Sequence, residues 1–352
     1  MTSERRTWRD HPLVQLTLVR YREFFREPEA VFWVFVFPVL LTAGLGIAFR
    51  NQAPERIRVA IVDDEGSRAL AETLKGGPDL QPEVLSDSAA AQALRTGRAA
   101  IVVVPGSGGR VEYRFDPERP ESRTARLQVD DALQRGSGRS DPVAVSEQRV
   151  SEPGSRYVDF VVPGLLGMNL MGSGIWGLGF SIVDARRKKL LKRMIATPMS
   201  RTQFLASFVL SRLTLLILEV GALVGFALFV FGVPVRGSPI SLLAICLLSA
   251  LAFGSLGLLL ASRTRTIEGA SGLMNLVMLP MWIFSGVFFS ASRFPDALQP
   301  FIQALPLTAV NDALRASMLE GAGWARLAPE LAIVAAWLVI SFVLAVRLFR
   351  WR

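Results

Sequence analysis

Six long apolar runs constrain this chain more than any other feature of its sequence. Each run is close to the ~20 residues that an α-helix needs to cross the hydrocarbon core of a bilayer. The overall hydrophobic content is 51%, but a water-soluble domain does not gather its apolar residues into runs of this length. The runs predict an α-helical polytopic membrane protein with six transmembrane helices, at residues 30–48, 158–183, 204–233, 239–261, 270–289 and 327–346.

Two prolines lie inside these predicted spans, Pro38 in the first and Pro280 in the fifth. A proline is tolerated inside a membrane helix because neighbouring helices can bond the carbonyl that it frees. The first run is long and lacks a clear small-residue cleavage site, so we interpret it as a retained anchor and not as a signal peptide.

Basic residues are distributed unevenly between the segments that join the spans. With a cytosolic N-terminus, the cytosolic segments carry 18 Lys and Arg residues, and the short loops on the other side carry four. The positive-inside rule therefore predicts that both termini are cytosolic. The net charge of +9 belongs to these cytosolic flanks, which disfavours a nucleic-acid surface and favours a cytosolic partner.

In this orientation the segment 49–157 lies outside. Its residue pattern predicts an extracytoplasmic α/β domain inserted between the first two spans. Residues 51–157 carry 15 basic and 17 acidic side chains. Apolar runs and alternation predict strands, and helical spacing predicts helices between them. The strands are expected at 57–64, 99–105 and 111–115, and the helices in "SRALAETLK", "SAAAQALRTGR" and "ESRTARLQVDDALQR". Asp63, Asp64 and Glu65 form either a solvated strand end or a cation site.

Several chemistries have little support in this sequence. One cysteine (Cys246) and one histidine (His11) provide neither a disulfide framework nor a His/Cys metal cluster. The glycines of "PGSGGR" (105–110) lack the lysine of a phosphate-binding loop, so ATP must be handled by another chain. We therefore expect no catalytic residue, no metal ligand and no directly bound cofactor.

The segment 184–203 joins the second and third spans and contains "DARRKKLLKRMIATPMSR". On a helical wheel its central residues separate into two sides. Lys188, Lys189, Lys192 and Arg193 lie on one side, and Leu190, Leu191, Met194 and Ile195 lie on the other. This pattern predicts a basic amphipathic helix at the membrane surface, ending near Thr197 and Pro198. It serves as a topology signal against anionic lipid, and a further role as a docking surface for a cytosolic partner stays open.

Residues 1–29 predict a second surface helix, on the cytosolic side, before the first span. Its apolar side comprises Leu13, Val14, Leu18, Tyr21, Phe24 and Phe25.

Polar residues within the spans are candidates for the transport path or for interhelical bonds. Arg212 and Glu219 lie seven residues apart on one face of the third span, and Asn169 and Asn275 lie in the second and fifth. Five glycines in the second span predict close helix packing, within the chain or in a dimer: Gly164, Gly167, Gly172, Gly174 and Gly177.

Three segments, in this order, resemble permease subunits of the type-2 family of ABC exporters, over nearly the whole chain. They are "REPEAVFWVFVFPVLL" at the first span, "LLKRMIATPMSR" after the second, and "PMWIFSGVFFSASRFPDALQPFIQALPLTAVNDALR" from Pro280 to Arg315. The resemblance implies that two permease subunits pair, as a homodimer or a related heterodimer. Two ATP-binding cassette subunits would dock beneath them and hold the ATP-Mg.

The resemblance also implies roles for particular residues. Segment 290–326 would form short re-entrant helices on the outer side, marked by Ser285, Gly286, Pro295, Pro306 and Arg315. The coupling of ATP hydrolysis to the spans would fall to Arg187, Lys188, Lys189, Leu191, Lys192, Arg193, Met194, Thr197 and Pro198.

We therefore expect a multi-pass protein of a bacterial plasma (inner) membrane, in contact with membrane lipid, that exports a hydrophobic or amphipathic substrate. A drug, a lipid-like molecule and a polysaccharide all fit that description. The alternative is a non-transporting scaffold or sensor whose extracytoplasmic domain binds a ligand or an envelope protein. An intramembrane enzyme is a third possibility.

Overall fold

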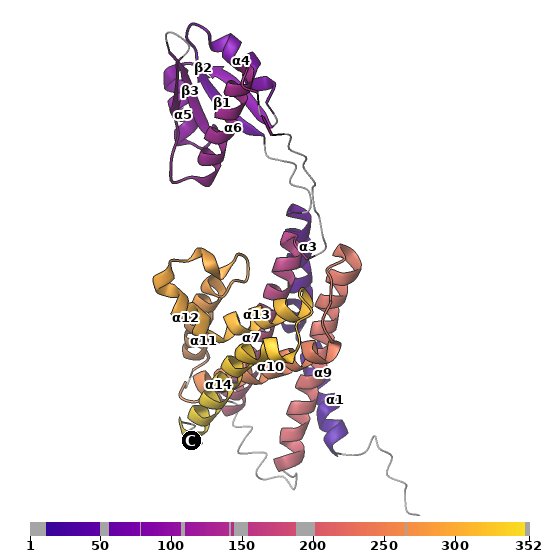
Figure 1. Cartoon of the computed structure of the whole chain (residues 1–352). Helices are drawn as coiled ribbons and strands as arrows, with labels where there is room; N and C mark the ends of the chain where they lie inside the picture. Colours follow the sequence, from indigo (N-terminus) through magenta and orange to yellow (C-terminus); the bar gives the residue numbers. More distant parts are fainter. Residues whose placement is uncertain are drawn as a thin grey trace, which may run out of the picture. The chain divides into compact units, whose positions relative to one another are not determined.

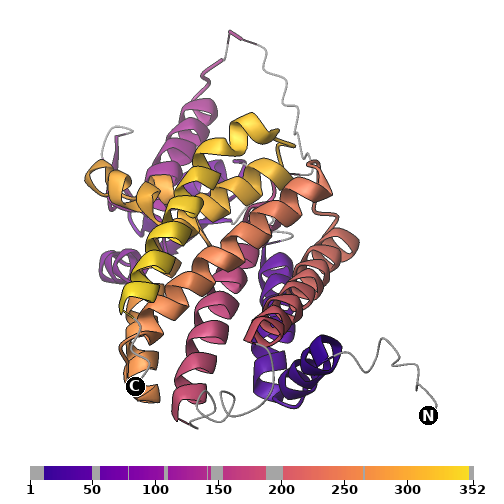
Figure 2. The same ribbon diagram turned by 90° about the horizontal axis from the view of Figure 1, so that it is seen from below.

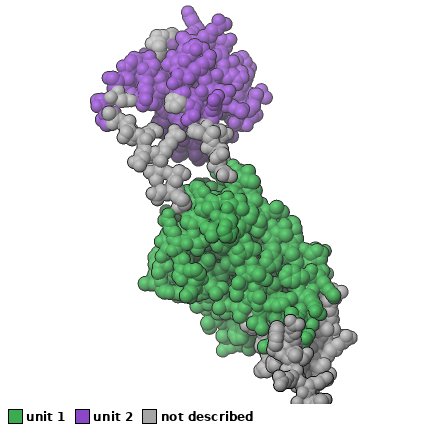
Figure 3. Space-filling view, turned by 90° about the vertical axis from the view of Figure 1, so that its right-hand side faces the viewer, with its two compact units in different colours: residues 1–50, 150–352 green, residues 51–149 purple. Residues whose placement is uncertain are grey.

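The computed structural model describes residues 12–49, 56–77, 79–106, 110–140, 142–143, 154–187, 201–264 and 266–348, without the side chains of 12, 184–187 and 201–209. The chain divides into two compact units, shown in different colours in Figure 3. Residues 1–50 and 150–352 form one, which we call the membrane unit, and residues 51–149 form the other, which we call the α/β unit.

Six helices among the described residues are long and apolar enough to cross a membrane, as the sequence predicts. The first span combines α2 (Pro28–Val31), the π-helix η2 (Phe32–Val36) and α3 (Phe37–Ala48). The other five are α7 (Tyr157–Arg187), α9 (Arg201–Phe231), α10 (Pro239–Ala261), α11 (Ile267–Phe284) and α14 (Trp324–Leu348). The chain is therefore a multi-pass membrane protein.

Helix α7 lies at the centre of the membrane unit. In its span 78% of the residues are buried, against 17% in the first and in the last span. Helices α7 and α10 lie side by side, and α14 packs on α10 (Figures 1 and 2). A helix buried on all sides must be apolar all round, which explains why the second run shows no amphipathic pattern.

Glycines allow α7 and α10 to approach closely, as predicted for the second span. A Cβ atom added at Gly174 would lie 2.7 Å from Cβ of Phe253, and one added at Gly257 would lie 2.5 Å from the carbonyl oxygen of Ile175. Two of the predicted glycines do not take part. In the described part of the chain, no atom of another segment lies within 4 Å of a Cβ atom added at Gly177, and one added at Gly172 would make only an ordinary contact.

The fifth span ends at Phe284, five residues earlier than predicted. Gly286 has φ +70, a left-handed conformation that ends the helix, and the chain continues through short elements. These are the 3-10 turns η4 (Ala291–Arg293) and η5 (Asp296–Leu298), followed by α12 (Gln299–Ala304) and α13 (Pro306–Met318). Most of α13 is buried, and it packs on α7 and α14.

Helix α1 (Pro12–Phe25) packs against α9 (Figures 1 and 2). Leu13, Val14, Tyr21 and Phe24 of the predicted apolar side are half-buried. Leu18 and Phe25 are 40% and 56% exposed, so the packed side of α1 is narrower than its apolar side.

The α/β unit contains a four-stranded sheet in the order β2-β1-β3-β4. Strand β1 (Ile57–Val62) pairs in parallel with β2 (Leu80–Leu85) and with β3 (Ile101–Pro105), and β4 (Val111–Arg114) runs antiparallel to β3. The structure confirms the three predicted strands. Strand β2 was not predicted, because "LQPEVL" contains Pro82 and Glu83, which fit a sheet edge better than a buried strand.

Three helices cover this sheet, and all three were predicted. Alternate residues of the buried strands face opposite sides. Val59 and Ile61 pack with α4 (Ser67–Lys75) and α6 (Pro120–Gly136), and Ala60 and Val62 pack with α5 (Asp87–Arg95). The unit therefore has hydrophobic packing of its own on both faces of the sheet.

Candidate functional site

Three polar side chains form a contact between the second and third spans. Arg212 and Glu219, both on α9, form an ion pair with 3.8 Å between their nearest nitrogen and oxygen. Ser173 on α7 donates a hydrogen bond to Oε1 of Glu219 (3.0 Å) and accepts one from Nη2 of Arg212 (2.7 Å). We call these three residues the polar triad.

The burial of the polar triad decides what it can contact. The side chain of Glu219 is 0% exposed, whereas that of Arg212 is 24% exposed. A carboxylate in an apolar environment is stable only with a partner, and Glu219 receives both a charge and a hydroxyl. The geometry therefore places Glu219 in a hydrogen bond that joins α9 to α7 within this chain, with its carboxylate surrounded by protein.

Asn169 connects the second span to the first. Pro38 has no N–H to bond the carbonyl of Val34 one turn earlier, and a π-helix lies at this point. The side-chain amide of Asn169 donates a 3.0 Å hydrogen bond to that carbonyl of Val34. The structure thus shows an asparagine from α7 bonding the backbone group that a proline in the first span frees.

We expect Asn169→Ala to lower the free energy of unfolding by about 1 kcal/mol, because the carbonyl of Val34 loses its donor where no water replaces it. In the Pro38→Ala background the same substitution should lower the free energy of unfolding by less, because residue 38 then supplies an N–H to the carbonyl of Val34. Unfolding of purified protein in detergent by added denaturant measures both effects. The matched control is Asn275→Ala on α11, whose side chain is exposed. Equal losses in both backgrounds would contradict this account.

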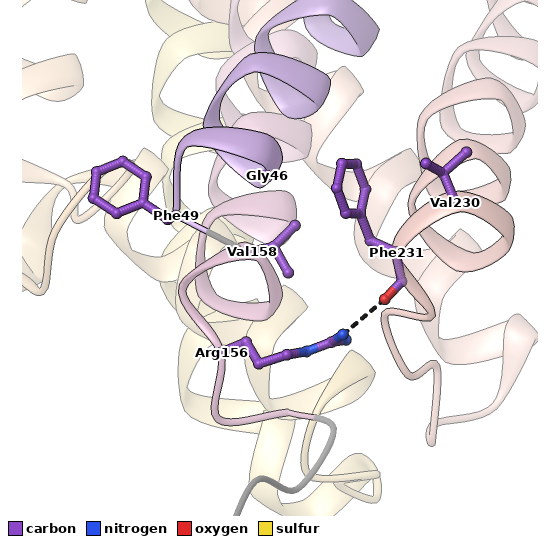
Figure 4. Close-up of a pocket in the computed structure, with 6 residues that line it drawn as sticks. All are labelled: Gly46, Phe49, Arg156, Val158, Val230 and Phe231. Carbon is purple, nitrogen blue, oxygen red and sulfur yellow. Dashed lines mark hydrogen bonds between the residues drawn. The ribbon is translucent and has the colours of Figure 1, made fainter. Parts of the chain in front are cut away.

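The end of the membrane unit at which α3 ends and α7 begins, which we call the insert end, is held by a second ion pair. Arg156 contacts the fully buried Asp159 through Nη2 and Oδ1 at 2.8 Å. It also donates to the carbonyl of Phe231 (2.8 Å), the last residue of α9, and to that of Gly232 (3.1 Å), which follows it. Figure 4 shows the guanidinium of Arg156 reaching from the start of α7 to the carbonyl of Phe231.

Arg156 lines a pocket of about 90 Å³ at this end. Its other walls come from α3, α7 and α9 (Figure 4), namely Gly46, Phe49, Val158, Val230 and Phe231. The ring of Phe231 lies against Gly46, where a Cβ atom would collide with it. The pocket is too small for a drug-sized molecule, which needs some 300 Å³ or more. We interpret it as a packing feature around the Arg156–Asp159 pair.

Arg315 holds α13 against the start of α7. Its guanidinium carbon lies 3.8 Å from the centre of the Phe160 ring, and its nitrogens donate to the carbonyls of Phe160 (3.4 Å) and Gly286. Burial lowers the pKa of Arg315 to about 10, a shift that Asp312 opposes from 3.6 Å, so the guanidinium stays charged at neutral pH. A charged guanidinium over an aromatic face adds a cation–π attraction to these hydrogen bonds.

The structure brings Ser285, Gly286 and Arg315 together. Arg315 bonds the carbonyl of Gly286, and Asn311, one turn earlier on α13, donates to the carbonyl of Ser285 at 2.8 Å. The two predicted prolines serve as helix starts, Pro306 at the beginning of α13 and Pro295 before η5.

Comparison with known proteins decides the family. The family model for ABC-2 family transporter proteins matches residues 29–347, which include the six spans except the first residue of the first and the last residue of the sixth. The chain belongs to the ABC-2 transporter family.

Two of the three relatives of this ABC-2 protein described here are named as permeases. The linearmycin resistance permease protein LnrN of Bacillus subtilis is 21% identical over 96% of this chain and 97% of its own length. The probable multidrug ABC transporter permease YbhS of Escherichia coli is 23% identical over 85% of this chain and 86% of its own. ABC transporter G family member 20 of Dictyostelium discoideum is 27% identical over 55% of this chain, which matches only 27% of that protein. The chain is therefore an ABC transporter permease, a transport component that is not itself catalytic, and its relatives imply an ATP-binding cassette partner.

The predicted coupling segment of this ABC-2 permease lies outside the described residues for the most part. Residues 188–200, with Lys188, Lys189, Leu191, Lys192, Arg193, Met194, Thr197 and Pro198, are not described. Arg187 is the last residue of α7, and its side chain is not described either. The role of this segment in the permease stays a prediction.

The structure adds residues that the sequence reasoning missed. Ser173 completes the polar triad, Arg156 and Asp159 form the ion pair at the insert end, and Asn311 bonds the end of α11. Opposite charges three residues apart at the start of an apolar run were a signal for the Arg156–Asp159 pair. Asn275, which was predicted, lies exposed on α11 and contacts none of these groups.

Proposed function

We propose that this permease forms, with a second permease subunit and two ATP-binding cassette subunits, an exporter of a hydrophobic or amphipathic substrate. The observation that carries the proposal is the near full-length likeness to LnrN and YbhS, whose names refer to linearmycin resistance and to multidrug transport. Outward transport from the cytosol is consistent with both names. A homodimer is the simplest arrangement, because one chain then supplies both permease positions.

We further propose that both termini and residues 184–203 are cytosolic, and that the insert end and the α/β unit face the other side of a bacterial inner membrane. The distribution of 18 basic residues against four supports this orientation. The basic segment 184–203 would then be the docking surface for the ATP-binding subunits, while its positive side also contacts anionic lipid.

The orientation predicts a labelling pattern in intact cells. In a Cys246→Ala background, a membrane-impermeant thiol reagent should modify a cysteine placed by Ser137→Cys and should not modify one placed by Ser200→Cys. Permeabilised cells should allow both to react, which controls for access. The reverse pattern in intact cells would show that the orientation is wrong.

Copurification tests the proposed function. A tagged permease, extracted from its own host in mild detergent after crosslinking, should carry an ATP-binding cassette subunit in a one-to-one ratio, identified by mass spectrometry. Recovery of a permease dimer alone would favour the scaffold or sensor alternative, in which the α/β unit binds a ligand or an envelope protein.

The docking proposal makes a separate prediction for that complex. Reversing the charges of Lys188, Lys189, Lys192 and Arg193 together should reduce transport at least tenfold while the permease still inserts, because the partner loses the basic face. Transport and ATP hydrolysis in reconstituted vesicles measure this effect. The matched control reverses Arg347 and Arg263, which lie on the same proposed side outside the segment. Unchanged transport in the fourfold variant would leave the segment as a topology signal only.

A further inference from the structure

The two faces of the sheet in the α/β unit are covered unequally. Helices α4 and α6 pack on one face, whereas α5, which is nine residues long, packs on the other. In the described part of the chain, the buried cluster beneath α5 consists mostly of alanines, namely Ala60, Ala90, Ala93 and Ala99. A short helix and short side chains leave space on this face of the sheet.

A pocket of about 100 Å³ lies beside α5 on this face. Ala89 and Ala93, one turn apart on α5, line it together with Ala60 of β1 and with Ala99. The methyl groups of these four alanines form an apolar floor, which we call the alanine floor. A cavity of roughly 150 Å³ holds a benzene molecule, so this pocket has room for a molecule of about six non-hydrogen atoms.

The register of two strands places opposite charges at the rim of this pocket. Glu83 of β2 pairs with Ala60 of β1 in the parallel ladder, so Glu83 lies on the face that α5 covers. Arg58 precedes Ala60 by two residues and lies on the same face. Both charged residues are exposed, and both line the pocket. A carboxylate and a guanidinium from neighbouring strands therefore border the alanine floor.

The turn after α5 adds a second guanidinium. Gly97 has φ +71, the left-handed conformation that ends a helix. The N–H of Ala99 then donates to the carbonyl of Ala93 at 3.1 Å, which holds the turn against α5. Arg98 lies in this turn, is exposed and lines the pocket. Two basic groups and one acidic group thus lie around one apolar floor.

These three charges are not neutralised within the described part of the chain, where no ion pair joins Arg58, Glu83 or Arg98 to another residue. Arg114 of β4, on the same face of the sheet, differs in this respect. It contacts Asp87 at 2.8 Å and Glu112 at 3.1 Å. The charges at the pocket are therefore available to a ligand that carries both signs.

We propose that this pocket binds a free α-amino acid with a small aliphatic side chain. The ligand carboxylate accepts hydrogen bonds from Arg58 and Arg98, since a guanidinium matches the planar geometry of a carboxylate. The ligand ammonium donates to Glu83, and the aliphatic side chain lies on the alanine floor. A ligand with only a negative charge is repelled by Glu83, and one with only a positive charge is repelled by the two arginines. The site lies within the α/β unit, so the proposal does not depend on transport.

Saturation-transfer NMR of the full-length permease in nanodiscs tests the site, with ¹³C-labelled L-alanine as the probe. We expect a Kd on the order of 1 mM, because six non-hydrogen atoms supply little binding energy. Propionate and ethylamine each lack one charged group, so they should displace the probe only at concentrations at least fivefold higher than unlabelled L-alanine. The absence of saturation transfer to L-alanine at about 10 mM, ten times that Kd, would overturn the proposal.

Charge-neutral variants assign the contacts. Arg58→Gln and Arg98→Gln should each weaken L-alanine binding at least fivefold, because the carboxylate loses a donor. Glu83→Gln should also weaken L-alanine at least fivefold but should leave the binding of ¹³C-labelled propionate unchanged or tighter, because propionate has no ammonium. A misfolded unit would lose both probes, so this difference separates a contact from a structural defect. Equal weakening of both probes by Glu83→Gln would overturn the assignment of the ammonium.

A steric variant and a matched control complete the test. Ala89→Leu fills the pocket and leaves its charges in place, so it should reduce saturation transfer to L-alanine at least tenfold. Arg68→Gln removes an exposed arginine of α4, which packs on the other face of the sheet, and should leave binding unchanged. Full binding to the Ala89→Leu variant, or an equal loss in Arg68→Gln, would show that L-alanine binds elsewhere.

Discussion

Glu219→Ala is expected to lower the free energy of unfolding by about 3–5 kcal/mol, the cost of breaking a buried ion pair by removing one partner. The substitution leaves the charge of Arg212 within the span with the hydroxyl of Ser173 as its one remaining partner among the described residues. It also leaves a cavity beside α7 where the fully buried carboxylate lay. Denaturant-induced unfolding of the purified permease in detergent measures the loss.

A double replacement separates the charge from the packing. Arg212→Met with Glu219→Leu removes both charges at similar volume and should recover most of the lost stability, because apolar pairs often replace buried ion pairs without cost. Ser173→Ala is a milder control that removes one hydroxyl and should cost about 1 kcal/mol. A double variant as unstable as Glu219→Ala would mean that the cavity, and not the unpaired charge, causes the loss.

The same variants address the role of Glu219 in transport. Because Glu219 contacts α7 within this chain, we expect Glu219→Ala to reduce assembly and transport in equal proportion. A selective loss of transport in a correctly assembled complex would instead place Glu219 on the path.

Gly257→Ala is expected to destabilise the permease by about 2–3 kcal/mol or more, in the range of overpacking a core. The new Cβ atom would lie 2.5 Å from the carbonyl oxygen and 2.9 Å from Cα of Ile175. Both are backbone atoms of the central helix α7, so no side chain can rotate away, and the two helices must separate. Thermal unfolding in detergent should show a lower midpoint.

Gly177→Ala provides the matched control for this contact. Gly177 lies on α7 two residues from Ile175, and no atom of another described segment lies within 4 Å of the added Cβ. Alanine there should be neutral or stabilise by about 0.5–1 kcal/mol, because alanine loses less backbone entropy than glycine in a helix. A loss of stability at Gly177 equal to that at Gly257 would show that the helix crossing is not the cause.

Most of the fold could be predicted from the sequence because the relevant signals are local. Length and hydropathy within each apolar run determine the six spans, since a bilayer helix must bond its own backbone. The short apolar runs at residues 57–64 and 99–105 likewise predict β1 and β3, which the structure confirms. Strand β2 was missed because Leu80–Leu85 lies at the sheet edge, where neither periodicity nor propensity is strong.

The sequence alone determined that Pro38 frees a carbonyl in the first span, and that Arg212 and Glu219 share a helix face. Only the tertiary structure decided which groups bond them. Asn169, 135 residues from Val34, donates to the freed carbonyl, and Ser173, 46 residues from Glu219, donates to its carboxylate. The same holds for Arg315, whose acceptor at Phe160 lies 155 residues away. The physical reason is that hydropathy and helix geometry act over a few residues, whereas a buried polar group takes its partner from whichever helix packs beside it.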